Sequence, residues 1–317
     1  MTITMLSSES TQPAEITKDF SSSRKLMDTA VSAVYAHKDE WVATGIHKRI
    51  AIIETLIKDV ARIAERWATR CCEAKGSCIN NSAAIEEWLG GPYLILCNLR
   101  SLRQSLLDIE KSGYPQIPGP ITVRSNGQVV AQVFPQNIYD HLLYFGISAE
   151  VWMQPGVTIE ELAQTQATIY QNKNHKGKVA LVLGAGNFSC LGPTDFLYKL
   201  FVEDQVVVYK TNPVNDYLDH LVEQGFRALI ERGFLRVVPG GVAEGTYLAH
   251  HPDIEEIHLT GSDKTFEAIV FGSGTEGAKR KAEREARAQR DPRTALPSPT
   301  PIVRFIKINE RPVPVRF

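Results

Sequence analysis

Short apolar runs alternate with helical segments between Lys178 and Leu259, and this alternation constrains the fold more than any other feature of the chain. The runs cover residues 178–183, 205–209, 235–238 and 254–259, and residues 195–201 and 217–230 between them have helical patterns. Short strands separated by longer helices form parallel sheets that are covered on both faces. We therefore expect a doubly wound, mostly parallel α/β sheet here.

The residues before this sheet predict a different organisation. Apolar side chains recur every three or four positions at Ile50, Ile53, Leu56, Ile57, Val60 and Ile63, and a second helical run covers 83–107. Residues 121–124 and 128–134 flank Asn126-Gly127, which predicts a hairpin. We expect a helical region with this hairpin over 1–177, the α/β unit over 178–278, and a basic, proline-containing, poorly ordered tail over 279–317.

Charge and composition exclude several classes of partner. The chain has 317 residues and a formal net charge of −1, so it has no overall field that would attract nucleic acid or an anionic membrane. Its apolar stretches are shorter than the ~20 residues that span a bilayer, and its start lacks the pattern of a secretory signal. We expect a cytoplasmic protein. Its five cysteines are then free thiols, and Cys71, Cys72 and Cys78 lack the histidine partners of a zinc site.

The residues that follow the four strands carry the chemistry. They are 184–187, 210–213, 239–241 and 260–262, each rich in glycine or polar side chains and each preceding a helix. Ligands of open α/β sheets bind at the carboxyl ends of the strands, and helix N-termini attract phosphate. The sequence therefore predicts a binding site at this edge of the sheet.

The loop after the first strand differs from the usual dinucleotide fingerprint. Ser189 stands where the third glycine is expected, and Lys210 stands at the end of the second strand in place of the usual acidic residue. A lysine at that place suits a ribose hydroxyl or a 2′-phosphate, and Ser262 could donate to a pyrophosphate. Each residue taken alone also has a purely structural interpretation. Lys210 could be a surface charge, Ser262 could begin an ordinary helix, and Asn187 could be a turn residue.

Together these motifs resemble the nucleotide-binding half of the aldehyde dehydrogenase superfamily, a Rossmann-like domain. The resemblance covers 179–272 and rests on Gly186-Asn187, 206–210, 237–240 and 258–262. It implies that Asn187 contributes to the oxyanion hole, and that NAD or NADP is the cofactor. It also implies that the cofactor-binding residues are Gly184, Gly186, Lys210 (ribose), Thr211, Asn212, Gly240 and Gly245 (adenine), Gly261 and Ser262 (pyrophosphate).

The sequence also departs from the family pattern. Ala185-Gly186 replaces the common Pro-Trp before Asn187, and Phe266 stands where a glycine is usual. Asn212-Pro213 replaces the acidic residue often found three positions after the lysine. Since that carboxylate would repel a 2′-phosphate, its loss predicts that NADP is tolerated.

The residues that perform catalysis in the family are missing from the printed sequence. The family uses a cysteine nucleophile and a glutamate general base in a Glu-Leu-Gly motif, both C-terminal to Ser262. Here no cysteine follows Cys190, and no Glu-Leu-Gly follows Gly261. Cys190 lies in the nucleotide loop without an identifiable base, which disfavours a catalytic role. We hypothesise a truncated or frame-shifted member, inactive alone, whose sequence from about 279 onward is foreign to the family.

Three functions remain open on the sequence alone. The first is NAD(P)-dependent oxidation of a small aldehyde to an acid, with this chain as the cofactor-binding half. The second is a pseudoenzyme or interaction module that retains a nucleotide site. The third is a relative of the acyl-thioester reductases. The expected partners are a dinucleotide, a small aldehyde and a further copy of the chain. The hairpin around Asn126 could contact that second copy. We expect neither nucleic acid nor a membrane as a partner.

Overall fold

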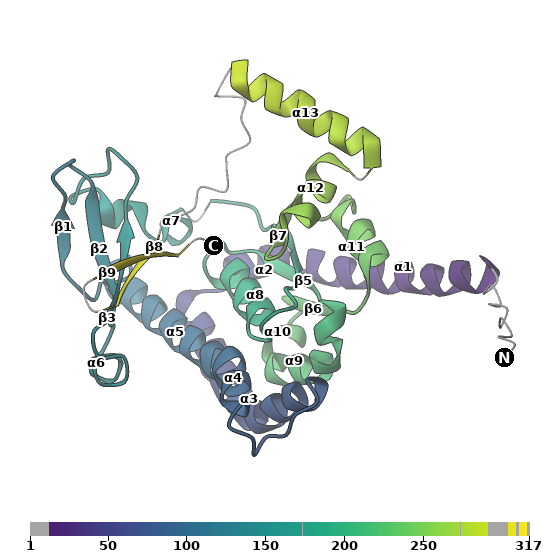
Figure 1. Cartoon of the computed structure of the whole chain (residues 1–317), viewed down its shortest axis with the longest axis horizontal. Helices are drawn as coiled ribbons and strands as arrows, with labels where there is room; N and C mark the ends of the chain where they lie inside the picture. The colour runs from purple at the N-terminus through teal and green to yellow at the C-terminus, as the bar shows by residue number, and fades with distance from the viewer. Residues whose placement is uncertain (1–12, 173, 273, 291–303, 309–310, 316–317) are drawn as a thin grey trace, which may run out of the picture. The chain divides into compact units, whose positions relative to one another are not determined.

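The computed structural model describes residues 13–172, 174–272, 274–290, 304–308 and 311–315 (Figure 1). The chain forms two compact units: residues 1–100 with 175–262, and residues 101–174 with 263–317. The first unit thus combines the N-terminal helices with the segment for which a parallel sheet was predicted. The division at 177 and 278 drawn from the sequence stays a prediction.

The first unit contains a four-stranded parallel sheet in the order β6-β5-β4-β7. Its strands are β4 (Val179–Leu183), β5 (Val206–Lys210), β6 (Leu235–Val238) and β7 (Glu256–Leu259). All residues of β4 and β5 are buried, as expected of central strands covered on both faces. This topology confirms the predicted α/β fold class.

Helices make up most of the rest of the first unit. They are α1 (Pro13–Tyr35), α2 (Lys38–Ala43), α3 (Ile46–Ala74), α4 (Ala84–Trp88), α8 (Leu191–Phe201), α9 (Asp219–Gly225), α10 (Arg227–Ile230) and α11 (Val242–Ala249), with a 3-10 turn, η3 (Pro213–Leu218). The apolar face predicted on α3 is buried, including Ile53, Leu56 and Val60. Trp41 packs edge-on against Phe201 and anchors α2 to the core.

The helical run predicted over 83–107 is interrupted. A π-helical turn, η1 (Leu89–Tyr93), separates α4 from α5 (Leu94–Ser112). Gly91 has φ −130° and ψ −114°, which is not helical, and Pro92 follows it. Proline lacks the N–H that a continuous helix requires, and glycine tolerates the irregular backbone. The predicted single helix is therefore wrong at this point.

The second unit contains an antiparallel sheet in the order β1-β2-β3-β8-β9. The strands are β1 (Ile121–Val123), β2 (Val129–Phe134), β3 (Ile147–Trp152), β8 (Arg304–Ile308) and β9 (Arg311–Val315); the helical segments are α6 (Ile138–Leu143), η2 (Leu162–Thr165), α7 (Thr168–Gln171), α12 (Asp263–Phe271) and α13 (Gly274–Arg290). β1 and β2 form the predicted hairpin around Gly127, which has φ +81°.

The predicted tail falls partly on residues that are described. α13 extends to Arg290 and so includes the start of this tail, while residues 291–303 lie outside the described residues. The strands β8 and β9 were not expected from the sequence. Across the described ranges, none of the helices is both long enough and apolar enough to cross a membrane.

Candidate functional site

The four loops predicted to form a site follow strands that end at one edge of the sheet. In the parallel register Leu183 lies beside Lys210 and Leu259, and Lys210 lies beside Val238. Two main-chain bonds extend this pairing past the strands, from Gly184 N to Lys210 O (3.0 Å) and from Thr211 N to Val238 O (3.1 Å). The structure therefore brings together the strand ends that the sequence analysis selected.

Lys210 is the most unusual residue at this edge. Its exposed fraction is 6%, and within the described residues no hydrogen bond or ion pair reaches its ammonium group. Burial lowers the pKa of Lys210 below its ordinary value, and the nearby carboxylates of Glu244 and Asp219 oppose that shift. A buried charge without a partner is costly, so this position favours an anionic or hydroxyl-bearing ligand.

The loop after β4 approaches the loop after β5 closely. Asn212 donates from Nδ2 to Gly184 O (3.2 Å), and its Oδ1 accepts from Val214 N (3.1 Å). A Cβ at Gly184 would lie 2.9 Å from the Tyr209 hydroxyl, and one at Gly186 would lie 3.2 Å from Asn212 Nδ2. Both glycines thus permit a close approach of the two loops. Because Thr211 is buried and Asn212 holds the loop, their assignment to the cofactor stays a prediction.

The same loop is attached to the N-terminal helices. Trp67 of α3 donates from Nε1 to Ser189 Oγ (2.9 Å), and Cys190 N donates to Gly90 O (3.0 Å). A Cβ at Gly90 would lie 2.5 Å from the ring of Phe188, so a larger residue there would displace that ring. Asn187 lies on the exposed part of this anchored loop.

The loop after β6 brings in a carboxylate that the sequence analysis missed. Gly241 N donates to Glu244 Oε2 (2.8 Å), so the side chain of Glu244 folds back over the start of α11. Gly240 has φ +140°, and a Cβ there would lie 2.5 Å from Glu244 Cγ. Gly245 is more open, since a Cβ would meet only Leu183 Cδ2 at 3.9 Å. The capping-box spacing of Glu244 was the available signal.

The electrostatic surroundings keep Glu244 ionised. Burial would raise the pKa of Glu244, but hydrogen bonds from its own backbone N–H, from Gly241 and from Ser23, together with the Lys210 charge, lower it below its ordinary value. Glu244 therefore carries a negative charge at neutral pH, beside the end of the strand that bears Lys210.

The loop after β7 contains the last of the predicted residues. Gly261 and Ser262 are exposed, and a Cβ at Gly261 would lie 3.3 Å from Leu259 Cδ1. Ser262 ends the first unit, and it follows β7 at the same edge as the other loops. The predicted pyrophosphate role of Ser262 stays a prediction.

All five cysteines are free thiols. Cys190, in the loop after β4, is not activated as a nucleophile. Burial raises the pKa of Cys190 to about 11, which leaves almost no thiolate at neutral pH. Burial also raises the pKa of Cys71, whereas Cys78 is exposed. Among the described residues no cluster of histidine, cysteine and carboxylate side chains could hold a metal ion.

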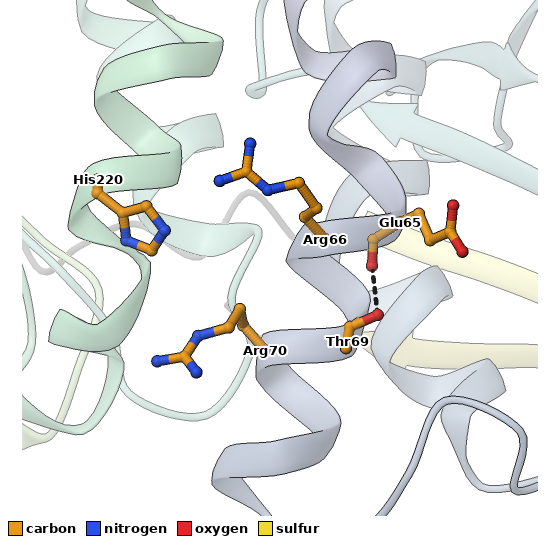
Figure 2. Close-up of a pocket in the computed structure, with 5 residues that line it drawn as sticks. All are labelled: Glu65, Arg66, Thr69, Arg70 and His220. Carbon is orange, nitrogen blue, oxygen red and sulfur yellow. Dashed lines mark hydrogen bonds between the residues drawn. The ribbon is translucent and has the colours of Figure 1, made fainter.

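A hollow of about 240 Å³ lies between α3 and α9, lined by Glu65, Arg66, Thr69, Arg70 and His220. Figure 2 shows both guanidinium groups extending toward His220, while the Glu65 carboxylate points away. Arg66 donates to Gln224 Oε1 (2.9 Å), and Arg70 donates to Glu73 Oε2 (2.8 Å). Because each arginine already has a side-chain partner, the hollow is a weaker candidate than the strand ends.

Comparison with known proteins shows a sequence similarity to an aldehyde dehydrogenase. No family model matches the chain. An aldehyde dehydrogenase of Enchytraeus buchholzi is 44% identical over 66 residues, which is 20% of this chain and 12% of that protein. The resemblance predicted from the sequence is confirmed over this segment. The match spans about an eighth of the relative's length.

The chain is also similar to solved structures. An aldehyde dehydrogenase from Bartonella henselae has a TM-score of 0.49 and 16% identity, over 82% of this chain and 42% of that one. A Pseudomonas syringae aldehyde dehydrogenase C mutant with NAD+ and octanal has a TM-score of 0.49 and 15% identity, over 81% and 41%. Proline utilization A of Bradyrhizobium japonicum has a TM-score of 0.49 and 17% identity, over 77% and 20%.

Proposed function

Given the confirmed resemblance to aldehyde dehydrogenases, we propose that the β6-β5-β4-β7 edge binds a pyridine dinucleotide, NAD or NADP. The single observation that carries this proposal is Lys210, a buried ammonium at the carboxyl end of a central parallel strand, to which none of the described residues makes a hydrogen bond or ion pair. Ligands of open α/β sheets bind at such strand ends. A ribose hydroxyl or a phosphate would supply the acceptor that Lys210 lacks.

The remaining residues at this edge have consistent proposed roles. Gly184 and Gly186 let the backbone approach the ligand, and Ser262 together with the main-chain N–H groups of the loops would donate to the pyrophosphate. Gly240 and Gly245 would lie beside the adenine. Asn187, on the exposed part of its loop, would direct an amide N–H at the oxyanion of a small aldehyde substrate. When bound, the nicotinamide would supply the acceptor for a hydride.

We further infer that this sequence alone binds the dinucleotide but does not oxidise aldehydes. The reaction needs a thiolate nucleophile and a general base, and the family places both after Ser262. No cysteine follows Cys190, whose pKa is raised to about 11. A nucleotide-binding pseudoenzyme and a relative of the acyl-thioester reductases would both retain the same site. The free cysteines fit a reducing, cytoplasmic setting.

Titration of the purified chain with NAD and with NADP tests the proposal. Wild type should bind at least one of them saturably, and Lys210→Met should weaken that binding by about tenfold or more, a loss of ~1.4 kcal/mol. Lys178→Met is the matched control, because Lys178 is exposed and precedes β4 at the opposite edge of the sheet. Absence of binding to wild type, or equal binding by Lys210→Met, would overturn the proposal.

A further inference from the structure

Glu244 lies over the turn that follows β6, whose end is beside the end of β5. Its carboxylate accepts from Gly241 N at 2.8 Å, which holds it over the turn that follows β6. β6 ends at Val238, which lies beside Lys210 in the parallel register and accepts a hydrogen bond from Thr211 N. The fold therefore places a carboxylate from α11 beside the end of β5.

This placement matters because dinucleotide sites recognise the adenosine ribose at the end of the second strand. An acidic residue there accepts from the ribose 2′-hydroxyl and disfavours a 2′-phosphate. In this chain Lys210 stands at that position, and Asn212-Pro213 follows it without an acidic residue. Glu244 supplies the missing carboxylate from the next strand and helix, 34 positions beyond Lys210 in sequence.

We propose that Glu244 makes the site selective for NAD over NADP. This inference rests on the proposed dinucleotide site and names the cofactor that the site takes. The carboxylate would accept from the 2′-hydroxyl of NAD, while Lys210 donates to the neighbouring hydroxyl. A 2′-phosphate would bring about two further negative charges against Glu244, and one lysine cannot neutralise both groups.

The position of Glu244 suits this role. Its side chain is partly exposed, so a ligand can reach it, and Gly241 and Ser23 fix it from the protein side. Since Gly240 has no side chain, the aliphatic part of Glu244 lies directly against the backbone of the turn after β6. The prediction that NADP is tolerated rests on Asn212-Pro213, which follow Lys210 in sequence. The folded chain brings the acidic group from elsewhere.

The test measures the dissociation constants of NAD and NADP for wild type, Glu244→Gln and Glu231→Gln. Wild type should bind NAD more tightly than NADP by about tenfold or more. The reason is that the 2′-phosphate of NADP and the Glu244 carboxylate carry like charges. Glutamine keeps an oxygen for Gly241 N and removes the charge, so Glu244→Gln should tighten NADP and bring the two constants within about threefold. Glu231 is an exposed glutamate paired with Arg227, and its variant should keep the wild-type ratio.

The outcomes separate this inference from the proposed function. Equal binding of the two nucleotides by wild type, or an unchanged ratio in Glu244→Gln, overturns the selectivity and leaves the dinucleotide site standing. Absence of any binding to wild type overturns both. A measurement that needs no variant is the ionic-strength dependence, because salt screens the repulsion of the 2′-phosphate. The preference of wild type for NAD should narrow as salt is added, and a constant preference would count against Glu244.

Discussion

Trp67 donates its indole N–H to the hydroxyl of Ser189 over 2.9 Å, although the two residues are 122 positions apart. The bond connects α3 with the loop between β4 and α8. Gly91 lies against both side chains, since a Cβ there would lie 3.0 Å from Ser189 Oγ and 3.3 Å from the Trp67 ring. The N-terminal helices thus fix the shape of the loop that carries Asn187.

Ser189→Ala should therefore reduce stability. Trp67 is 1% exposed, so its N–H would lose a buried acceptor, which typically costs ~1–3 kcal/mol. Urea unfolding measures this loss, and NAD affinity should weaken with it because the loop is less constrained. Thr55→Ala is a suitable control, since its exposed hydroxyl bonds only within α3. Equal stability of Ser189→Ala and wild type would show that the bond is dispensable.

The buried ion pair between Arg49 and Asp204 should matter more for stability. Arg49 is 2% exposed and Asp204 is 6% exposed, and His175 Nε2 lies 2.7 Å from the other Asp204 oxygen. Asp204→Asn leaves a buried guanidinium without its counter-charge, for which we expect a loss of ~3–5 kcal/mol. Asparagine tolerates the φ of +59° at this position. The control is Glu73→Gln, which removes the exposed ion pair between Glu73 and Arg70. Thermal or urea unfolding should show that this variant loses far less stability, below about 1 kcal/mol.

Lys210 should make stability depend on pH. Its folded pKa lies below the ordinary 10.5, so between those two values the unfolded chain binds more protons than the folded one. The contribution of Lys210 to the free energy of unfolding therefore increases as pH rises toward 10.5. Lys210→Met should be more stable than wild type near neutral pH, and this difference should shrink with rising pH. If the stability difference between Lys210→Met and wild type stayed constant from about pH 7 to about pH 10, the pKa of Lys210 would not be lowered in the folded chain.

The strand order of the site could be predicted because its signals are local. Each strand is an apolar run that ends in glycine or polar residues, and parallel pairing then places all ends at one edge. The π-helical turn at Gly90-Gly91-Pro92 escaped prediction because the apolar positions around it are continuous, as in one buried helix. β9 escaped because Pro312 and Pro314 argue against a strand, although proline is tolerated in an edge strand such as this one.

The site was less predictable than the fold because its residues interact across strands. Glu244 was absent from the sequence-based selection, since its capping-box spacing indicates only a helix start and says nothing about Lys210. Asn212 was selected as a cofactor residue, and in the structure its side chain bonds to the loop after β4. Such roles depend on distances between segments that no spacing rule encodes.

Cysteine labelling should distinguish the buried thiol of the loop after β4 from an active nucleophile. The thiolate is the reactive form, and burial raises the pKa of Cys190 to about 11. Iodoacetamide near pH 8 should label the exposed Cys78 first and leave Cys190 unmodified in the folded chain, as followed by mass spectrometry. In denaturant the two should react alike. Rapid labelling of Cys190 in the native chain would instead indicate an activated thiol.

Gly245→Ala should move stability and nucleotide affinity in opposite directions. Gly245 lies inside α11, where alanine is favoured over glycine by ~0.5–1 kcal/mol, and the added methyl would meet only Leu183 Cδ2 at an ordinary 3.9 Å. The variant should therefore unfold at higher urea concentration than wild type.

If the adenine lies against Gly245, the same methyl group takes up its space, and NAD affinity should fall by about tenfold. Thr246→Ala, in the same helix but exposed, controls for a general effect on α11 and should leave NAD affinity unchanged. A stabilised Gly245→Ala that binds NAD as tightly as wild type would place the adenine elsewhere along the edge. Because the stability gain shows that the helix is intact, a loss of affinity in this variant can be assigned to the site itself.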